Sequence, residues 1–321
     1  MKLIDFPKKI SYNYYDKAIN NKIDYLSRFS QVLSVYQIGN VKHPGISDID
    51  LLVIFKNDVV FEKNPLINSD KVDKYLFSHN LFGLSQYYFN ESMNYSFFSN
   101  FKLLYGKKNS LNNSLKKDEI KKLKKQIALE YLIKNYIVLT MQLKYKILKV
   151  RTLLLEINAI KFDLDFLNIK NKKINSFIEE LIHFRDNWYN AKPTNTEIIA
   201  WTLEFYTFLE QLINEELTKT IFYVGSKKQY IFNNNIKLTK SNSFYFNHTG
   251  FNVSLIKYFY INKKIFNLHN RFNFFNFYIP YNDINDDCIL KDKKYYERNV
   301  INYNKLYLPY FTPLKTSLNL T

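Results

Sequence analysis

The stretch GNVKHPGISDIDLLVIF, residues 39–55, decides how the rest of the chain is interpreted. It joins a turn with glycine and proline to an apolar run, and two aspartates, Asp48 and Asp50, stand where that run begins. A short run of apolar and β-branched residues after turn residues is typical of a buried strand. The sequence therefore predicts a strand over residues 49–55 with two carboxylates at its start.

The residues on either side of this stretch predict a mixed α/β domain over residues 1–110. Apolar residues recur there at helical spacing or form short β-branched runs. The further elements expected are a helix over 14–29, a strand over 32–38, a short helix over 70–79, and strands over 84–89 and 101–105. The two aspartates are therefore expected at the start of the second strand, directly after the glycine turn.

The remainder of the chain predicts two further regions. Residues 107–117, KKNSLNNSLKK, are polar and predict a linker. Apolar residues then recur at three and four residues, which predicts an α-helical bundle over 118–217. Beyond it, aromatic runs such as 258–260 and 274–279 alternate with Asn and Lys. We expect a small β-containing region over 218–321.

The spacing of the two aspartates indicates a metal site. Residues two apart on a strand project to the same side, so the two carboxylates would lie together while Ile49 faces the opposite layer. Such a pair repels itself unless a cation lies between, and Mg²⁺ commonly takes one or two carboxylates together with substrate phosphates. Gly39, which has no side chain, would let the backbone approach a phosphate. Metal and phosphate would then meet at one place.

The pattern Gly39-Asn40, seven residues, and Asp48-Ile49-Asp50 resembles the signature of the nucleotidyltransferase superfamily, which has the DNA polymerase beta-like fold. In that family, glycine followed by serine or glycine precedes an Asp-x-Asp or Asp-x-Glu motif on the next strand. The resemblance covers residues 14–106. It implies an α/β (α+β) nucleotidyltransferase-like N-terminal domain with a mixed sheet, ahead of the helical bundle and the C-terminal region.

The resemblance also implies an activity. Such enzymes transfer a nucleoside monophosphate from a nucleoside triphosphate, such as ATP, to a hydroxyl or amino acceptor and release pyrophosphate. By this likeness Asp48 and Asp50 would hold two Mg²⁺ ions, while Gly39 and Asn40 would bind the triphosphate and Ser47 would add a supporting hydroxyl. The chemistry needs mainly charge and alignment.

A third carboxylate is the incomplete part of this pattern. Active family members place it on a later strand, and residues 84–98 offer only Glu91 as a metal ligand. Asp70 and Asp73 are alternatives, although both are typical of a helix start. Two other functions therefore stay open. One is a nucleotide-binding or antitoxin-like partner protein without turnover, and the other is a transferase that adds nucleotides to an RNA end.

The charge of the chain gives a weaker indication of partners. Lys and Arg number 46 against 29 Asp and Glu, for a formal net charge of +17. Such a charge favours polyanionic partners, nucleic acid among them. Yet the basic residues are spread along a chain that is rich throughout in Lys, Asn, Ile, Tyr and Phe. Charge alone therefore does not predict a nucleic-acid partner.

Cysteine content and hydropathy bear on the location of the protein. The single cysteine, Cys288, excludes a disulfide within the chain, and no Cys or His cluster has zinc-ligand spacing. The first residues contain no apolar leader, and the most hydrophobic helical region, 131–155, is interrupted by basic residues. We therefore expect a cytoplasmic protein without a membrane span.

Overall fold

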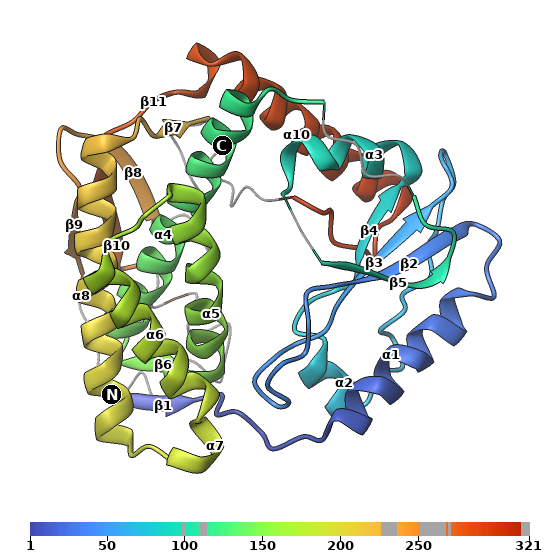
Figure 1. Cartoon of the computed structure of the whole chain (residues 1–321), viewed down its shortest axis with the longest axis horizontal. Helices are drawn as coiled ribbons and strands as arrows, with labels where there is room; N and C mark the ends of the chain where they lie inside the picture. The colour runs from blue at the N-terminus through green and yellow to red at the C-terminus, as the bar shows by residue number, and fades with distance from the viewer. Residues whose placement is uncertain (98–99, 110–113, 226–235, 251–267, 269–270, 316–321) are drawn as a thin grey trace. The chain divides into compact units, whose positions relative to one another are not determined.

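The computed structural model describes residues 1–97, 100–109, 114–225, 236–250, 268 and 271–315 (Figure 1). These residues have a mixed α/β fold with mixed sheets, so the predicted class is confirmed at this level. They divide into two compact units. The sheet unit contains residues 7–120 and 292–315, and the helical unit contains residues 1–6 and 121–291. The predicted range 218–321 thus contributes to both units.

A four-stranded sheet forms the centre of the sheet unit. Its strands are β2 (Val32–Ile38), β3 (Asp50–Phe55), β4 (Phe82–Ser85) and β5 (Phe101–Gly106). The order is β4-β3-β2-β5, in which β2 is antiparallel to β3 and β5, whereas β3 and β4 are parallel. The strands predicted over 32–38, 49–55 and 101–105 are confirmed within a residue of each end.

Four helices accompany this sheet. They are α1 (Tyr12–Leu26), α2 (Lys71–Leu76), α3 (Gln86–Tyr95) and, from Asp292 onward, α10 (Cys288–Tyr307). The strand predicted over 84–89 is wrong, because β4 ends at Ser85 and a helix follows at once. The Ser85 hydroxyl accepts a hydrogen bond from the backbone N–H of Tyr88 at 3.4 Å, which caps α3. A serine at this position favours a helix start over continued strand.

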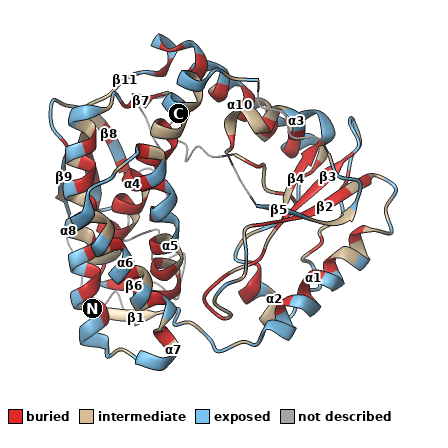
Figure 2. Cartoon of the chain, viewed as in Figure 1, coloured by how far each residue is buried: buried red, intermediate tan, exposed pale blue. Residues whose placement is uncertain are grey.

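Most residues of β2, β3 and β4 are buried (Figure 2). The two faces of the sheet bury separate clusters of apolar side chains. Ile49, Leu51 and Val53 pack on one face with residues of α1 and α2. Leu52 and Ile54 pack on the other face with residues of α3 and α10. This alternation confirms that Ile49 lies on the opposite side of the strand from Asp50, which shares its side with Leu52 and Ile54.

The carboxyl-terminal segment of the chain extends this sheet. The backbone N–H of Gly83 donates to the carbonyl of Thr312 at 3.0 Å, and that of Thr312 donates to the carbonyl of Leu81 at 2.9 Å. The Asn304 side chain donates to the Gly83 carbonyl at 3.0 Å. Gly83 leaves room for this approach, because a Cβ there would lie 2.7 Å from the Cβ of Phe311. Residues 292–315 therefore complete the sheet unit.

The helical unit contains the predicted bundle. Its helices are α4 (Lys117–Lys144, mostly in this unit), α5 (Val150–Leu167), α6 (Lys172–Asp186), α7 (Trp188–Ala191) and α8 (Asn195–Lys219). Its short strands are β1 (Lys2–Ile4) with β6 (Ile147–Lys149), β7 (Tyr223–Val224) with β11 (Asn282–Asp283), and the sheet of β8 (Ile236–Lys240), β10 (Phe274–Ile279) and β9 (Tyr245–Thr249). A 3₁₀ turn, η2, covers Ile284–Asp286. The aromatic run 258–260 and residues 110–113 of the predicted linker lie outside the described residues.

None of the described helices combines the length and the apolar composition that crossing a membrane requires.

A desolvated carboxyl group makes the stability of the helical unit depend on pH. Burial raises the pKa of Glu156 on α5 to about 7, although the charge of Lys134 lowers it. The folded state then binds more protons than the unfolded state between the two pKa values, so stability falls as pH rises from about 4.5 to 7. We expect Glu156→Gln to raise the free energy of unfolding by about 1–3 kcal/mol at pH 8 and to change it little at pH 4.5.

Urea denaturation at both pH values measures this difference. The exposed Glu179→Gln on α6 serves as the control, and an equal effect of Glu156→Gln at the two pH values would contradict the assignment.

Candidate metal centre

The sequence motif lies at one end of the strands of the four-stranded sheet, where β2 ends and β3 begins. Ile38, the last residue of β2, is paired with Asp50, the first residue of β3, so Gly39 follows directly beside the two aspartates. Gly39 has a φ of +70°, which favours glycine, and a Cβ built there would meet no atom within 4 Å. The turn therefore leaves open space next to the carboxylates, as backbone binding of a phosphate requires.

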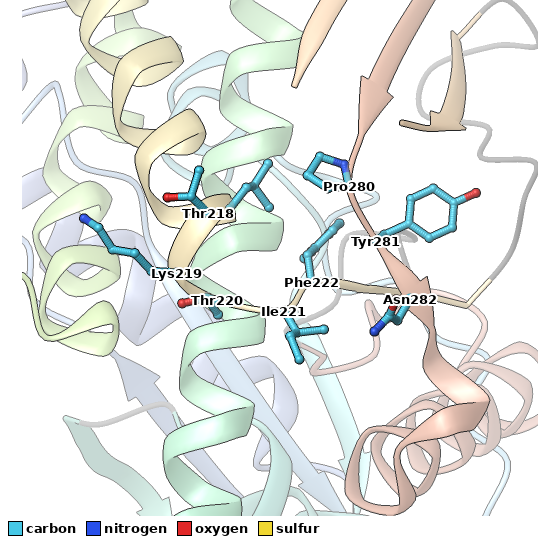
Figure 3. Close-up of a pocket in the computed structure, with 9 residues that line it drawn as sticks. Thr218, Lys219, Thr220, Ile221, Phe222, Pro280, Tyr281 and Asn282 are labelled. Carbon is cyan, nitrogen blue, oxygen red and sulfur yellow. The ribbon is translucent and has the colours of Figure 1, made fainter. Parts of the chain in front are cut away.

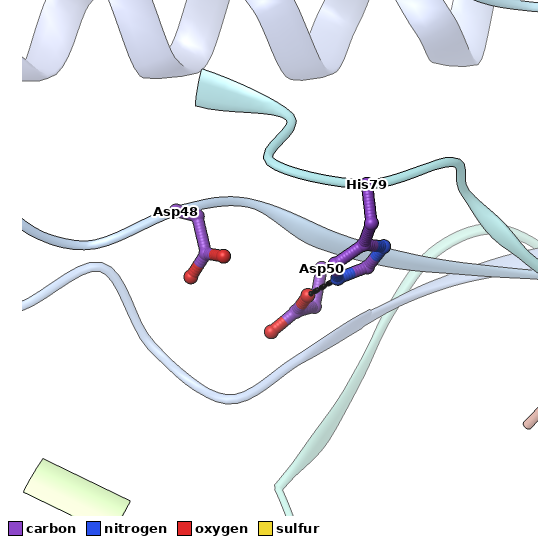
Figure 4. A group of neighbouring side chains, drawn as sticks. All are labelled: Asp48, Asp50 and His79. Carbon is purple, nitrogen blue, oxygen red and sulfur yellow. Dashed lines mark hydrogen bonds and ion pairs between the residues drawn. The ribbon is translucent and has the colours of Figure 1, made fainter. Parts of the chain in front are cut away.

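Asp48, Asp50 and His79 lie together where β3 begins and form a candidate metal-binding group, since their donor atoms could hold an ion (Figure 4). One donor atom from each residue lies within 4.8 Å of the donors of the other two. His79 Nε2 is 2.8 Å from Asp50 Oδ1. All three residues are partly exposed, so an ion could reach them from solvent. In the part of the chain that the structure describes, no other group of three His, Cys, Asp or Glu residues comes together in this way.

The topology of the sheet brings His79 to the carboxylates. Strand β4 runs parallel to β3 with Leu52 opposite Phe82, so the residues before β4 lie beside the residues before β3. The backbone N–H of Ile49 donates to the carbonyl of Leu76 at 2.9 Å and fixes this arrangement. The Ser78 hydroxyl donates to Asp48 Oδ2 and orients that carboxylate.

Both ring nitrogens of His79 have oxygen partners. Nδ1–H donates to the carbonyl of Asn80 at 2.6 Å, and Nε2 faces Asp50. Burial lowers the pKa of His79, but the hydrogen bond and charge of Asp50, the Asn80 carbonyl and the charge of Asp48 together raise it to about 9. The imidazolium thus balances the two carboxylates when no metal is bound. A metal that binds Nε2 must displace that proton.

Two buried tyrosines hold the turn that leads to Asp48. The Tyr15 hydroxyl on α1 accepts from the Gly45 N–H at 2.8 Å and donates to the Ser47 carbonyl at 2.6 Å. The Tyr75 hydroxyl on α2 donates to the Gly45 carbonyl. The turn is thereby fixed from two helices, and so is the start of the strand that carries the aspartates.

Loss of the Tyr15 hydroxyl is expected to destabilise the sheet unit. Tyr15→Phe removes the partner of a buried N–H and of a carbonyl, which costs about 1–3 kcal/mol of unfolding free energy. Urea denaturation measures this loss. Tyr14→Phe on the same helix is the matched control, because Tyr14 is 54% exposed. Equal stability of the two variants would show that these hydrogen bonds do not hold the turn.

The other residues named from the sequence lie in different settings. Asn40 is exposed beside Gly39. Ser47 is buried, and its hydroxyl accepts from the His43 N–H at 3.3 Å, which ties it to the turn. Asp70 caps α2 through the N–H groups of Val72 and Asp73. Asp73 itself pairs with Lys22, Nζ to Oδ2 3.1 Å.

Glu91, the predicted third carboxylate, is not part of the metal-binding group. It lies on α3, and burial raises its pKa. Burial also raises the pKa of Tyr95 and Tyr296, and the charge of Glu91 adds to both shifts, so this carboxyl lies in the tyrosine-rich layer of α3 and α10. At the edge of the sheet, β5 begins with Phe101 and Lys102 and supplies no acid.

Sequence reasoning missed His79. His79 lies 29 residues after Asp50 in the sequence, and no motif of fixed spacing links the two. One signal was available: an apolar run, 81–85, follows His79 and comes after a short helix. A strand–helix–strand connection favours a parallel neighbour, which places the residues before both strands at the same edge.

A depression of about 250 Å³ lies in the helical unit (Figure 3). Residues 217–222 and 280–282 line it. Lys219, its cationic residue, is already paired with Glu216, Nζ to Oε1 3.3 Å. No acid, histidine or cysteine is among its lining residues. The depression therefore offers no side chain suited to metal binding or acid–base catalysis, unlike the candidate metal-binding group.

No family model matches the chain, and no curated protein or solved structure matches it at a significant level.

Proposed function

We propose that the protein is a divalent-cation-dependent nucleotidyltransferase, which transfers a nucleoside monophosphate from a nucleoside triphosphate to a hydroxyl or amino acceptor. The observation that supports this most is the meeting of the open Gly39 turn with Asp48 and Asp50 at one sheet edge. The order of helix, strand, glycine turn and carboxylate-bearing strand also resembles that of the nucleotidyltransferase superfamily. Mg²⁺ is the cation that this resemblance implies.

Two of the residues at this site, Asp48 and Asp50, are suitable ligands for a divalent cation. Asp48 and Asp50 supply hard oxygen donors, and the Ser78 hydroxyl orients Asp48. A bound cation would neutralise triphosphate charge and align the α-phosphate with the attacking group. The backbone at Gly39 and the exposed amide of Asn40 would donate hydrogen bonds to phosphate oxygens. The attacking oxygen or nitrogen then bonds to the α-phosphorus, and pyrophosphate leaves.

Pyrophosphate release tests this proposal. Purified protein is incubated with each of the four common ribonucleoside triphosphates, with Mg²⁺ or Mn²⁺, and with acceptor pools that include small hydroxyl compounds, amines and an RNA oligonucleotide. We expect cation-dependent pyrophosphate release and a nucleotidyl adduct that mass spectrometry detects on one acceptor class. Labelling of the RNA end alone would identify the RNA-end transferase.

A binding function at the same site is the second candidate. The specific observation is that the described metal-binding group contains His79 and no third carboxylate. Calorimetric titration with nucleotide and cation separates the two candidates: binding without pyrophosphate release for any acceptor identifies the nucleotide-binding protein. Absence of nucleotide binding with either cation would contradict both.

A further inference from the structure

Three side chains, not two, offer donors to an ion at the sheet edge. Asp48 and Asp50 offer oxygens, and His79 offers Nε2 within the same 4.8 Å. Mg²⁺ takes oxygen ligands almost exclusively, whereas imidazole suits first-row transition metals such as Fe, Ni, Cu and Zn. The third donor, the imidazole of His79, therefore does not suit Mg²⁺, the cation that the family resemblance implies.

The surroundings of His79 match those of a metal ligand. Its Nδ1–H donates to the Asn80 carbonyl at 2.6 Å, which fixes the ring with Nε2 toward the carboxylates. Histidines that bind metals usually donate their second ring N–H to a carbonyl or carboxylate in this way. The ring also packs on Phe82, at a centroid distance of 4.7 Å. In the same way, the Ser78 hydroxyl donates a hydrogen bond to Asp48 Oδ2 and orients that carboxylate.

We propose that His79 is a metal ligand and that it makes the site select a first-row transition cation, of which Mn²⁺ is the representative, over Mg²⁺. The inference rests on the proposed function in that it names the cation of the same site. Two carboxylates and one imidazole combine donors that suit Mn²⁺ with one that Mg²⁺ accepts poorly. The geometry fixes which nitrogen coordinates the ion: Nε2, not Nδ1.

Electron paramagnetic resonance of Mn²⁺ tests this inference without any turnover. Untagged protein is titrated with Mn²⁺, and Mg²⁺ is then added as a competitor. We expect Mn²⁺ to bind more tightly than Mg²⁺, because an imidazole nitrogen is a donor that Mg²⁺ accepts poorly. Electron spin-echo modulation of the bound Mn²⁺ should show ¹⁴N coupling, which ¹⁵N-histidine labelling should replace with ¹⁵N coupling.

His79→Asp is the informative variant, because it restores an all-oxygen ligand set. Mn²⁺ bound to this variant should show no nitrogen coupling. The ratio of Mn²⁺ affinity to Mg²⁺ affinity should fall by about tenfold or more. His183→Asp on α6, an exposed histidine of the helical unit, should change neither. The wild-type spectrum alone can overturn the proposal: bound Mn²⁺ without nitrogen coupling, equal competition by Mg²⁺, or no Mn²⁺ binding would each do so. Nitrogen-coupled Mn²⁺ without nucleotide binding would keep the inference and remove the proposed function.

Discussion

Replacing Asp50 with asparagine is expected to lower cation affinity and nucleotidyl transfer by at least about 100-fold. Loss of a residue that only orients a metal ligand lowers metal affinity or activity by about 10–100-fold, and Asp50 would be a direct ligand. Its carboxylate lies between the other two donors, 2.8 Å from His79 Nε2 and within 4.8 Å of Asp48. Asparagine has nearly the same size and can still accept from His79, so the fold should persist while the negative charge is lost.

The comparison variant for this experiment is Asp24→Asn. Asp24 is an exposed aspartate on α1 of the same unit, so the two variants change the net charge equally. Calorimetric Mn²⁺ or Mg²⁺ titration and pyrophosphate release are measured on both, with circular dichroism as the check on folding. If Asp50→Asn and Asp24→Asn bind cation with the same affinity, the cation is not at the sheet edge.

A chain that ends at Lys291 is expected to lose the folded sheet unit. Truncation removes large buried side chains from its two apolar clusters: Tyr296, Val300, Tyr303, Leu308, Phe311 and Leu314. At about 1.5–3 kcal/mol for each, their burial contributes roughly 10–20 kcal/mol. A whole domain is stable by only about 5–15 kcal/mol. Amide hydrogen exchange of β3 and β4 measures the loss, and protected amides in the truncated chain would contradict it.

A pair of point variants tests the same packing in the complete chain. Phe311 is buried against Phe55, with ring centroids 5.0 Å apart, whereas Tyr310 is 41% exposed. Phe311→Ala should lower the free energy of unfolding by about 3–5 kcal/mol. Tyr310→Ala should change it by less than about 0.5 kcal/mol. Similar effects of the two would show that the segment does not pack as described.

The central strands could be predicted because their signals are local. The runs 32–38 and 49–55 are rich in β-branched and apolar residues, and turn residues lie between them. Composition and boundaries therefore both indicate strands. The strand period predicted that Asp48 and Asp50 share a side, and the preceding turn predicted that Gly39 lies near them. The structure bears out this local geometry through the pairing of Ile38 with Asp50.

The missed features depend on contacts between distant parts of the chain. The hydrogen bond from Asn304 to Gly83 spans 221 residues, and no local pattern encodes it. Helix α10 itself had a signal, since Tyr296, Val300 and Tyr303 recur at helical spacing, but aromatic runs nearby favoured strands. At 84–89, the apolar residues suited a strand, and the capping serine Ser85 ended it. His79 joined the carboxylates only through the parallel pairing of β3 and β4.

The central claim is that Asp48, Asp50 and His79 hold a divalent cation next to the Gly39 turn. Its most direct test is a crystal structure with Mn²⁺ and a non-hydrolysable nucleoside triphosphate, with the metal located by anomalous scattering. We predict an anomalous peak within about 2.5 Å of oxygens of Asp48 and Asp50 and of His79 Nε2, with triphosphate oxygens at Gly39. A map without a peak there, in which Asp50 keeps its contact with His79 and Asp48 its contact with Ser78, would contradict the claim.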